Sequence, residues 1–103
     1  MGNRELLSPQ EIEQELKALP GWKSLGGKLR RELRFPSFQE AFAFMTGAAL
    51  VAERMNHHPE WSNLYNRVVV ELTTHDSGGI TQNDMEFAKE AEGIAALLQG
   101  TAG

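Results

Sequence analysis

Apolar residues recur at helical spacing along one stretch in the middle of the chain, and they form two adjacent stripes. The first stripe is Phe38, Phe42, Met45, Ala49 and Ala52. The second stripe is Ala41, Phe44, Ala48, Val51 and Met55. A helix with so wide an apolar face must be covered on more than one side. Because a small sheet covers only one stripe, we expect another subunit to cover Phe44, Val51 and Met55. The alternative cover is the first helix of the same chain.

A pair of strand-like segments lies on each side of this helix. The four segments are residues 22–25, 28–35, 61–65 and 67–74. The first pair flanks Gly26-Gly27, and two such runs around a glycine pair predict a β-hairpin. The second pair predicts a hairpin that turns near Asn66.

Capping signals place one further helix near each end of the chain. Ser8 can cap the first helix, with Pro9 at its first position and Glu11 completing a capping box. Thr81 can cap the last helix, and Asp84 follows three residues later in the same arrangement.

The resulting order of elements is α-β-β-α-β-β-α. It predicts an α+β domain in which helices pack on one face of a four-stranded antiparallel sheet. We expect residues 1–103 to form this one domain, with residues 1–7 and 100–103 as loose ends.

Composition excludes several classes of protein. The net charge of −4 disfavours nucleic-acid binding, which needs a basic face. The basic cluster of Lys28, Arg30, Arg31 and Arg34 is interpreted as one solvated face of a strand. The absence of cysteine excludes disulfides and thiolate chemistry. No apolar run approaches the ~20 residues of a membrane span, and the N-terminal sequence lacks the apolar core of a signal peptide, so we expect a cytoplasmic protein.

The three histidines of the chain lie at the ends of predicted elements. His57 and His58 end the central helix, and His75 follows the last predicted strand. Glu53 lies four residues before His57, so the two side chains share a face if the helix extends that far. Spacing alone leaves three interpretations open: surface histidines with an incidental ion pair, acid–base catalysis, and a three-histidine metal site. Asp84 is more simply explained by its place in the first turn of a helix, where the helix dipole favours a carboxylate.

Three short motifs in the sequence are specific enough to indicate a protein family. Residues 53–61 read Glu-Arg-Met-Asn-His-His-Pro-Glu-Trp, residues 65–68 read Tyr-Asn-Arg-Val, and residues 72–76 read Leu-Thr-Thr-His-Asp. Together with Gly79 they resemble the signature of the pterin-4a-carbinolamine dehydratases, over roughly residues 22–98. The combination of His-His-Pro with a Thr-His loop at this separation carries the resemblance. The pattern is similar to the bacterial branch of that family.

The resemblance implies a reaction and the residues that perform it. The family removes water from a tetrahydropterin that aromatic amino acid hydroxylases leave hydroxylated at carbon 4a, and the product is quinonoid dihydropterin. By resemblance, His57 and His75 are the acid–base pair and His58 positions the substrate. The residues expected to bind the pterin are Glu53, Asn56, Pro59, Thr74, Asp76, Ser77 and Asp84.

The resemblance also bears on cofactors and partners. No metal or separate cofactor is implied, because the pterin is itself the substrate. The family assembles as homodimers or homotetramers, which agrees with the wide apolar face of the central helix. The alternative function is that of a non-enzymatic assembly or dimerisation factor of the same fold. Such relatives can lose active-site histidines, so the presence of all three favours the enzyme.

Overall fold

The computed structural model describes residues 4–103 of the chain. In chain order the elements are α1 (Pro9–Leu16), β1 (Lys23–Leu25), β2 (Lys28–Arg34), α2 (Phe38–Met55), β3 (Glu60–Leu64), β4 (Arg67–Leu72), the 3₁₀ helix η2 (His75–Ser77), α3 (Gln82–Leu97) and β5 (Thr101–Ala102). The predicted capping boxes are present at Ser8 and at Thr81.

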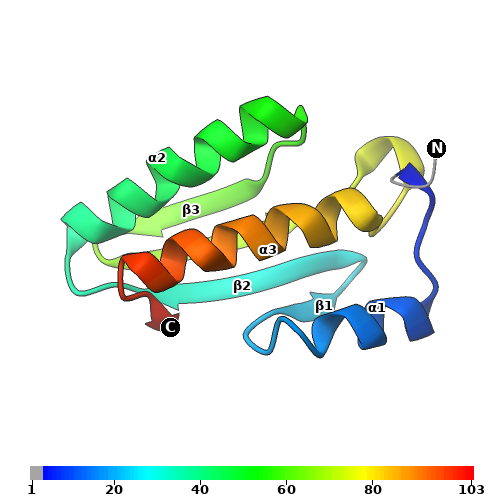
Figure 1. The fold of residues 1–103 in the computed structure, drawn as a ribbon, viewed down its shortest axis with the longest axis horizontal. Helices are drawn as coiled ribbons and strands as arrows, with labels where there is room; N and C mark the ends of the chain where they lie inside the picture. The colour runs from blue at the N-terminus through cyan, green and yellow to red at the C-terminus, as the bar shows by residue number, and fades with distance from the viewer. Residues whose placement is uncertain (1–3) are drawn as a thin grey trace.

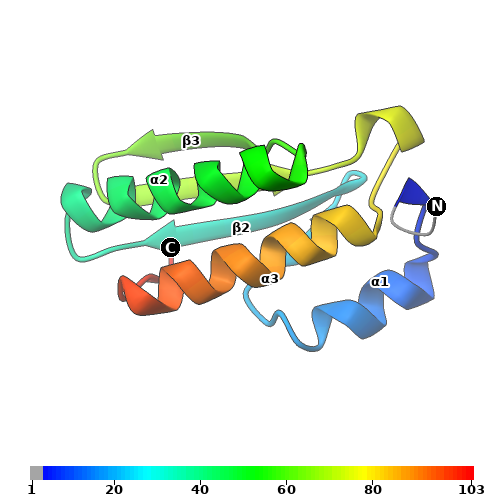
Figure 2. The same cartoon turned by 45° about the horizontal axis from the view of Figure 1, so that its top comes forward.

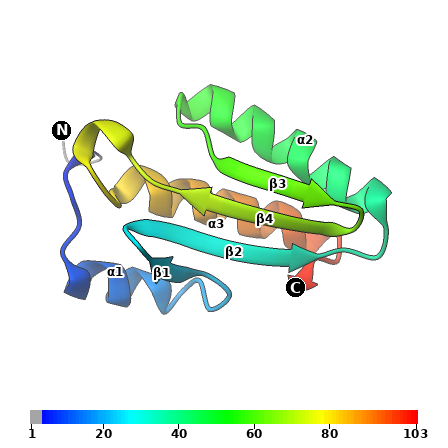
Figure 3. The same ribbon diagram turned by 180° about the vertical axis from the view of Figure 1, so that it is seen from behind.

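The strands form one antiparallel sheet in the order β1-β2-β4-β3, and β5 also pairs with β2. Helices α2 and α3 lie side by side in front of the sheet (Figure 1), and the view from behind shows the open face of the same sheet (Figure 3). Helix α1 lies beside β1 at one margin of the sheet (Figure 1), and the turned view shows it next to α3, on the side away from α2 (Figure 2). The predicted α+β class and the order of the elements are confirmed.

The C-terminal end of the chain differs from its prediction, because it forms a fifth strand. Thr101 and Ala102 pair with the end of β2, and the backbone N–H of Gly103 donates to the carbonyl of Glu32. Strand β1 covers only the first part of this edge of β2, so the remaining backbone groups are free to pair with the tail. At the other end, the N–H of Leu7 donates to the carbonyl of Ile80 over 2.9 Å. Residues 1–3 of the predicted loose end lie outside the described part.

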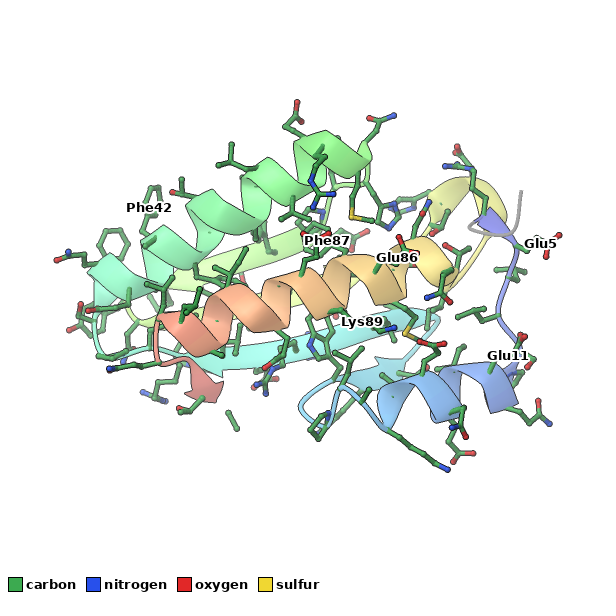
Figure 4. All side chains as sticks on the ribbon, viewed as in Figure 1. Glu5, Glu11, Phe42, Glu86, Phe87 and Lys89 are labelled. Carbon is green, nitrogen blue, oxygen red and sulfur yellow. The ribbon has the colours of Figure 1, made fainter. Side chains whose placement is uncertain are left out.

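The core shows which apolar stripe of α2 is covered within one subunit. It is the second stripe, for which the sequence predicted cover by another subunit, so that prediction is wrong. Phe44 is fully buried and Val51 is 8 % exposed, because α3 and the sheet cover the second stripe within one subunit. Neither another subunit nor α1 is needed for that cover. The first stripe is exposed at its N-terminal end, with Phe38 and Phe42 at 47 % and 54 %, whereas Ala52 at its other end is buried. Figure 4 shows Phe42 on the outer side of α2, whereas Phe87 lies between α2 and α3.

The predicted solvated basic face is wrong at one position. Arg31 lies two residues from both Leu29 and Leu33, so the three side chains share the helix-covered face of β2. The side chain of Arg31 is only 8 % exposed. Its guanidinium pairs with Glu92 of α3, and Trp22 donates to the same carboxylate over 2.8 Å. A buried arginine requires such a partner, because an unpaired charge in the interior is strongly destabilising.

No helix within residues 4–103 combines the length and the apolar character that crossing a membrane would require.

Candidate functional site

The end of α2 determines how the first two histidines are presented. Asn56 closes the helix in the left-handed conformation, with φ 51° and ψ 46°, and the N–H of His57 returns to the carbonyl of Ala52. The sequence placed His57 and His58 at the end of this helix, but the helix ends earlier, at Met55. Asparagine tolerates the left-handed region better than most residues, which makes this cap possible.

His57 turns inward from this cap and contacts a buried carboxylate. Its Nε2 lies 2.5 Å from Oδ1 of Asp84, and Asp84 has no exposed surface. The other oxygen, Oδ2, accepts hydrogen bonds from the Thr81 backbone N–H and the Thr74 hydroxyl, both over 2.9 Å. Asp84 therefore caps α3 and holds the ring of His57 at the same time. Because it is fully buried, Asp84 can influence a substrate only through the two pocket residues that it contacts, His57 and Thr74.

His58 turns outward and pairs with a different carboxylate. Its Nε2 lies 2.6 Å from Oε2 of Glu53, and both side chains are exposed. The sequence suggested that Glu53 would face His57, on the condition that the helix extended to residue 57. Because α2 ends before that residue, Glu53 reaches His58 instead.

His75 lies at the start of η2 and pairs with Glu60, the first residue of β3. The distance from His75 Nε2 to Glu60 Oε2 is 3.1 Å. The other oxygen of Glu60 accepts a hydrogen bond of 2.5 Å from the ammonium of Lys28 on β2. That hydrogen bond, with the nearby charges of Lys28 and His75, lowers the pKa of Glu60 below its usual value. Sequence reasoning did not select Glu60 or Lys28 as site residues, although the predicted hairpins place Lys28 at the start of one strand and Glu60 directly before another.

The three histidines meet at a pocket of about 250 Å³. Its walls are formed by Arg4, Asn56, His57, His58, Thr73, Thr74, His75 and Asp76. Of the other residues selected from the sequence, Glu53 contacts the rim through His58, and Asp84 lies behind His57. Pro59 and Ser77 do not line the pocket. Larger hollows border α1 and the C-terminal strand, but no histidine lines them.

Arg4 is a pocket residue that the sequence gave no reason to select. Its guanidinium pairs with Asp76 over 2.7 Å, and its carbonyl accepts a hydrogen bond from the hydroxyl of Ser77. The N-terminal segment thus ties down the loop that carries His75. Asp76 and Ser77 were expected to bind the pterin, and both are engaged by Arg4 in this structure.

The pocket does not gather ligands for a metal ion. Within residues 4–103, no three histidine or carboxylate side chains converge closely enough to hold one. Each histidine instead faces its own carboxylate, on a different element of the fold.

Comparison with known proteins identifies the family. The family model described as "Pterin 4 alpha carbinolamine dehydratase" matches residues 5–94. The chain belongs to this family. The resemblance recognised from the His-His-Pro and Thr-His motifs is therefore confirmed.

Individual members of the pterin carbinolamine dehydratase family match the chain over most of its length. A protein of Solibacter usitatus is 52 % identical over 90 residues, which cover 87 % of this chain and 95 % of the relative. One of Prochlorococcus marinus is 48 % identical over 90 residues, covering 87 % and 94 %. Both carry the name "Putative pterin-4-alpha-carbinolamine dehydratase".

A solved structure supports the same assignment of fold. The crystal structure of a "transcriptional coactivator/pterin dehydratase" from Brucella melitensis is similar to this chain with a TM-score of 0.84. The two sequences are 43 % identical, and the match covers 86 % of this chain and 97 % of the other. The family names denote a lyase that acts on a small pterin.

Proposed function

We propose that the chain converts 4a-hydroxytetrahydropterin to quinonoid dihydropterin and water by histidine acid–base catalysis. The observation that carries this proposal is the pocket at which three histidines meet, each with its own carboxylate within 3.1 Å or less. A carboxylate partner orients an imidazole ring and determines which ring nitrogen faces away from it. Incidental surface histidines have no reason to show this arrangement three times.

The reaction requires one proton donor and one proton acceptor. A proton delivered to the 4a hydroxyl lets the bond from carbon 4a to oxygen break with water as the leaving group. The lone pair of N5 forms the new double bond to carbon 4a, and the proton on N5 passes to a base. The net change is loss of one water molecule, and no oxidant or nucleophile takes part. Positioned general acids and bases typically contribute ~10²–10⁴-fold each.

His57 and His75 are assigned to these two proton transfers, and His58 to holding the substrate. In all three rings Nε2 faces a carboxylate, so Nδ1 is the nitrogen left to exchange a proton with the substrate. His57 is nearly buried and held by Asp84, whereas His75 lies on an exposed turn. The pair therefore offers one rigid and one more accessible proton carrier.

The direct test is a stopped-flow assay with chemically prepared 4a-carbinolamine. We expect dehydration by the untreated protein, an unchanged rate after chelator treatment, and large losses in His57→Gln and His75→Ala. Gln at position 57 keeps a polar group against Asp84, and circular dichroism checks that each variant is folded. Near-normal turnover in both folded variants would overturn the acid–base assignment. A rate that chelator abolishes and zinc restores would favour a metal site.

We also propose that the protein is a homo-oligomer that pairs through the outer face of α2. Phe38, Phe42 and Leu50 leave large apolar side chains in water on this helix. A second copy of the chain would cover them, and each large side chain so buried is worth ~1.5–3 kcal/mol. Light scattering behind size exclusion should report a multiple of 11.4 kDa. Phe42→Asp should lower that mass, and a monomeric wild type would contradict the proposal.

In the cell, we propose that this activity recycles the pterin cofactor of an aromatic amino acid hydroxylase in the cytoplasm. The quinonoid product must be reduced before the cofactor can be used again, so a reductase is the reaction that follows. The complete set of histidines favours this role over that of a non-enzymatic assembly factor.

A further inference from the structure

His75 is the one proposed catalytic residue on an exposed turn, and such a ring needs something to hold it. Its side chain is 74 % exposed, whereas that of His57 is 8 % exposed. A solvated imidazole samples several rotamers, and only some of them aim a ring nitrogen at a substrate. The turn that carries it is the three-residue η2, which ends at Gly78 in the left-handed conformation.

Glu60 supplies the restraint from a rigid element. It is the first residue of β3, its backbone is fixed by pairing with Glu71 of β4, and its Oε2 lies 3.1 Å from His75 Nε2. Glu60 is itself held at its other oxygen, where Lys28 of β2 donates a 2.5 Å hydrogen bond. Lys28, Glu60 and His75 thus form a chain of contacts that begins in the sheet and ends at the pocket.

We propose that Glu60, anchored by Lys28, is a positioning residue that directs Nδ1 of His75 toward the substrate. The inference rests on the proposed dehydratase activity and adds a residue to its mechanism. With Nε2 turned to the carboxylate of Glu60, only Nδ1 is free to give or take the substrate proton. A glutamate is ionised at neutral pH, and the hydrogen bond from Lys28 lowers the pKa of Glu60 further.

The arrangement predicts a specific kinetic pattern. Glu60→Gln keeps the shape and removes the charge, whereas Glu60→Ala removes the contact altogether. We expect Glu60→Ala to lower kcat roughly tenfold, less than the ~10²–10⁴-fold that a catalytic acid or base supplies. Glu60→Gln should lower it less, and KM should stay within about twofold, since Glu60 touches the histidine rather than the substrate.

Glu71→Gln is the matched control. Glu71 lies directly opposite Glu60 on the same face of the sheet and pairs with Arg30 rather than with a histidine. We expect its kcat to stay within about twofold of wild type. Lys28→Met should act in the same direction as Glu60→Gln, and adding it to Glu60→Ala should cause no further loss, because the two residues act in series.

A second measurement separates this inference from the proposed function. The order of the His75 ring can be followed by carbon-13 NMR relaxation in the absence of substrate, and it should fall in Glu60→Ala but not in Glu71→Gln. An inactive wild type would overturn the proposed function, and the ring order would still decide whether Glu60 holds His75. Unchanged ring order with kcat within twofold in Glu60→Ala would overturn the positioning role. A loss of kcat in Glu71→Gln as large as that in Glu60→Gln would also overturn the positioning role, because removing any carboxylate charge from this face of the sheet would then have the same effect.

Discussion

Replacing Asp84 by Asn should weaken both the fold and the proposed chemistry, because one buried carboxylate caps α3 and also contacts His57. It accepts hydrogen bonds from Thr81 and Thr74 at one oxygen and contacts His57 at the other. The amide oxygen of Asn can replace only one side of this arrangement. If it keeps the cap at Thr81, the amide NH₂ group is turned against His57 Nε2.

The cost in stability can be worked from these contacts. A hydrogen bond to a charged group contributes about 1.5–3 kcal/mol and a neutral one about 0.5–1.5 kcal/mol, so the exchange loses roughly 1–1.5 kcal/mol. Loss of a negative charge in the first turn of α3 removes about 0.3–1 kcal/mol more. The total of about 2 kcal/mol corresponds to a fall in Tm of about 8–16 °C for a domain of this size.

The effect on activity has a separate cause. An NH₂ group facing Nε2 forces His57 to accept there, so its proton moves to Nδ1 and the neutral ring is held in the wrong tautomer for a base. We expect kcat to fall by about a hundredfold, within the range that general acid–base catalysis supplies. Calorimetry gives Tm, and the stopped-flow assay gives kcat.

The control is Glu86→Gln, which removes an exposed carboxylate two residues further along α3 (Figure 4). It should change stability by no more than about 0.5 kcal/mol and leave kcat unchanged. An Asp84→Asn protein with a Tm within about 2 °C of wild type and a kcat within twofold would refute the reasoning. The Asp84–His57 contact would then carry neither stability nor catalysis.

Three further predictions concern stability. Hydrogen bonds from Arg30 to Glu32 and from Lys28 to Glu60 lower the pKa of each carboxyl, so the stability that these bonds add is present above pH 4.5 and lost below it. Denaturant unfolding between pH 7 and 3 should show this loss, and a free energy of unfolding that rises on acidification would contradict it. A Cβ on Gly21 would lie 2.1 Å from the Arg31 guanidinium, so Gly21→Ala should lower the free energy of unfolding by about 1–3 kcal/mol. Gly93→Ala, which adds a methyl group in open space on α3, should raise it by about 0.5–1 kcal/mol, and equal urea midpoints for the two variants would refute this contrast. Because of its left-handed φ, Asn56→Ala should lose about 1 kcal/mol and Asn56→Gly should not, and the reverse order in urea titration would exclude strain at this cap.

Most of the fold could be predicted from the sequence because its signals are local. The capping boxes at Ser8 and Thr81 and the glycine pair between β1 and β2 each act within a few residues. What the sequence could not reveal depends on contacts between distant segments. The tail pairs with an edge that β1 happens to leave free, and the covered stripe of α2 is decided by α3.

The candidate site, too, could be predicted only in part from the sequence. The histidines stand out in the sequence through their motifs, but their partners do not. Asp84 is 27 residues from His57, and its place in a capping box already explained it fully. Glu53 was selected for the wrong histidine, because a left-handed Asn56 ended the helix before it could align them.

The three histidine–carboxylate pairs differ in burial, and that difference agrees with the different roles proposed for the three rings. Asp84 is fully buried and bound by three donors, so the ring of His57 has a fixed direction and a strong electrostatic partner. Glu53 and His58 are both exposed, and a pair of that kind is weak and adaptable, which suits contact with a substrate that must enter and leave. His75 is exposed, but its carboxylate is anchored through Lys28 to the sheet, so the exposed turn that carries it is tied to a strand. Under the proposed mechanism, a pocket built in this way would hold the proton carrier His57 still and let His75 reach the substrate.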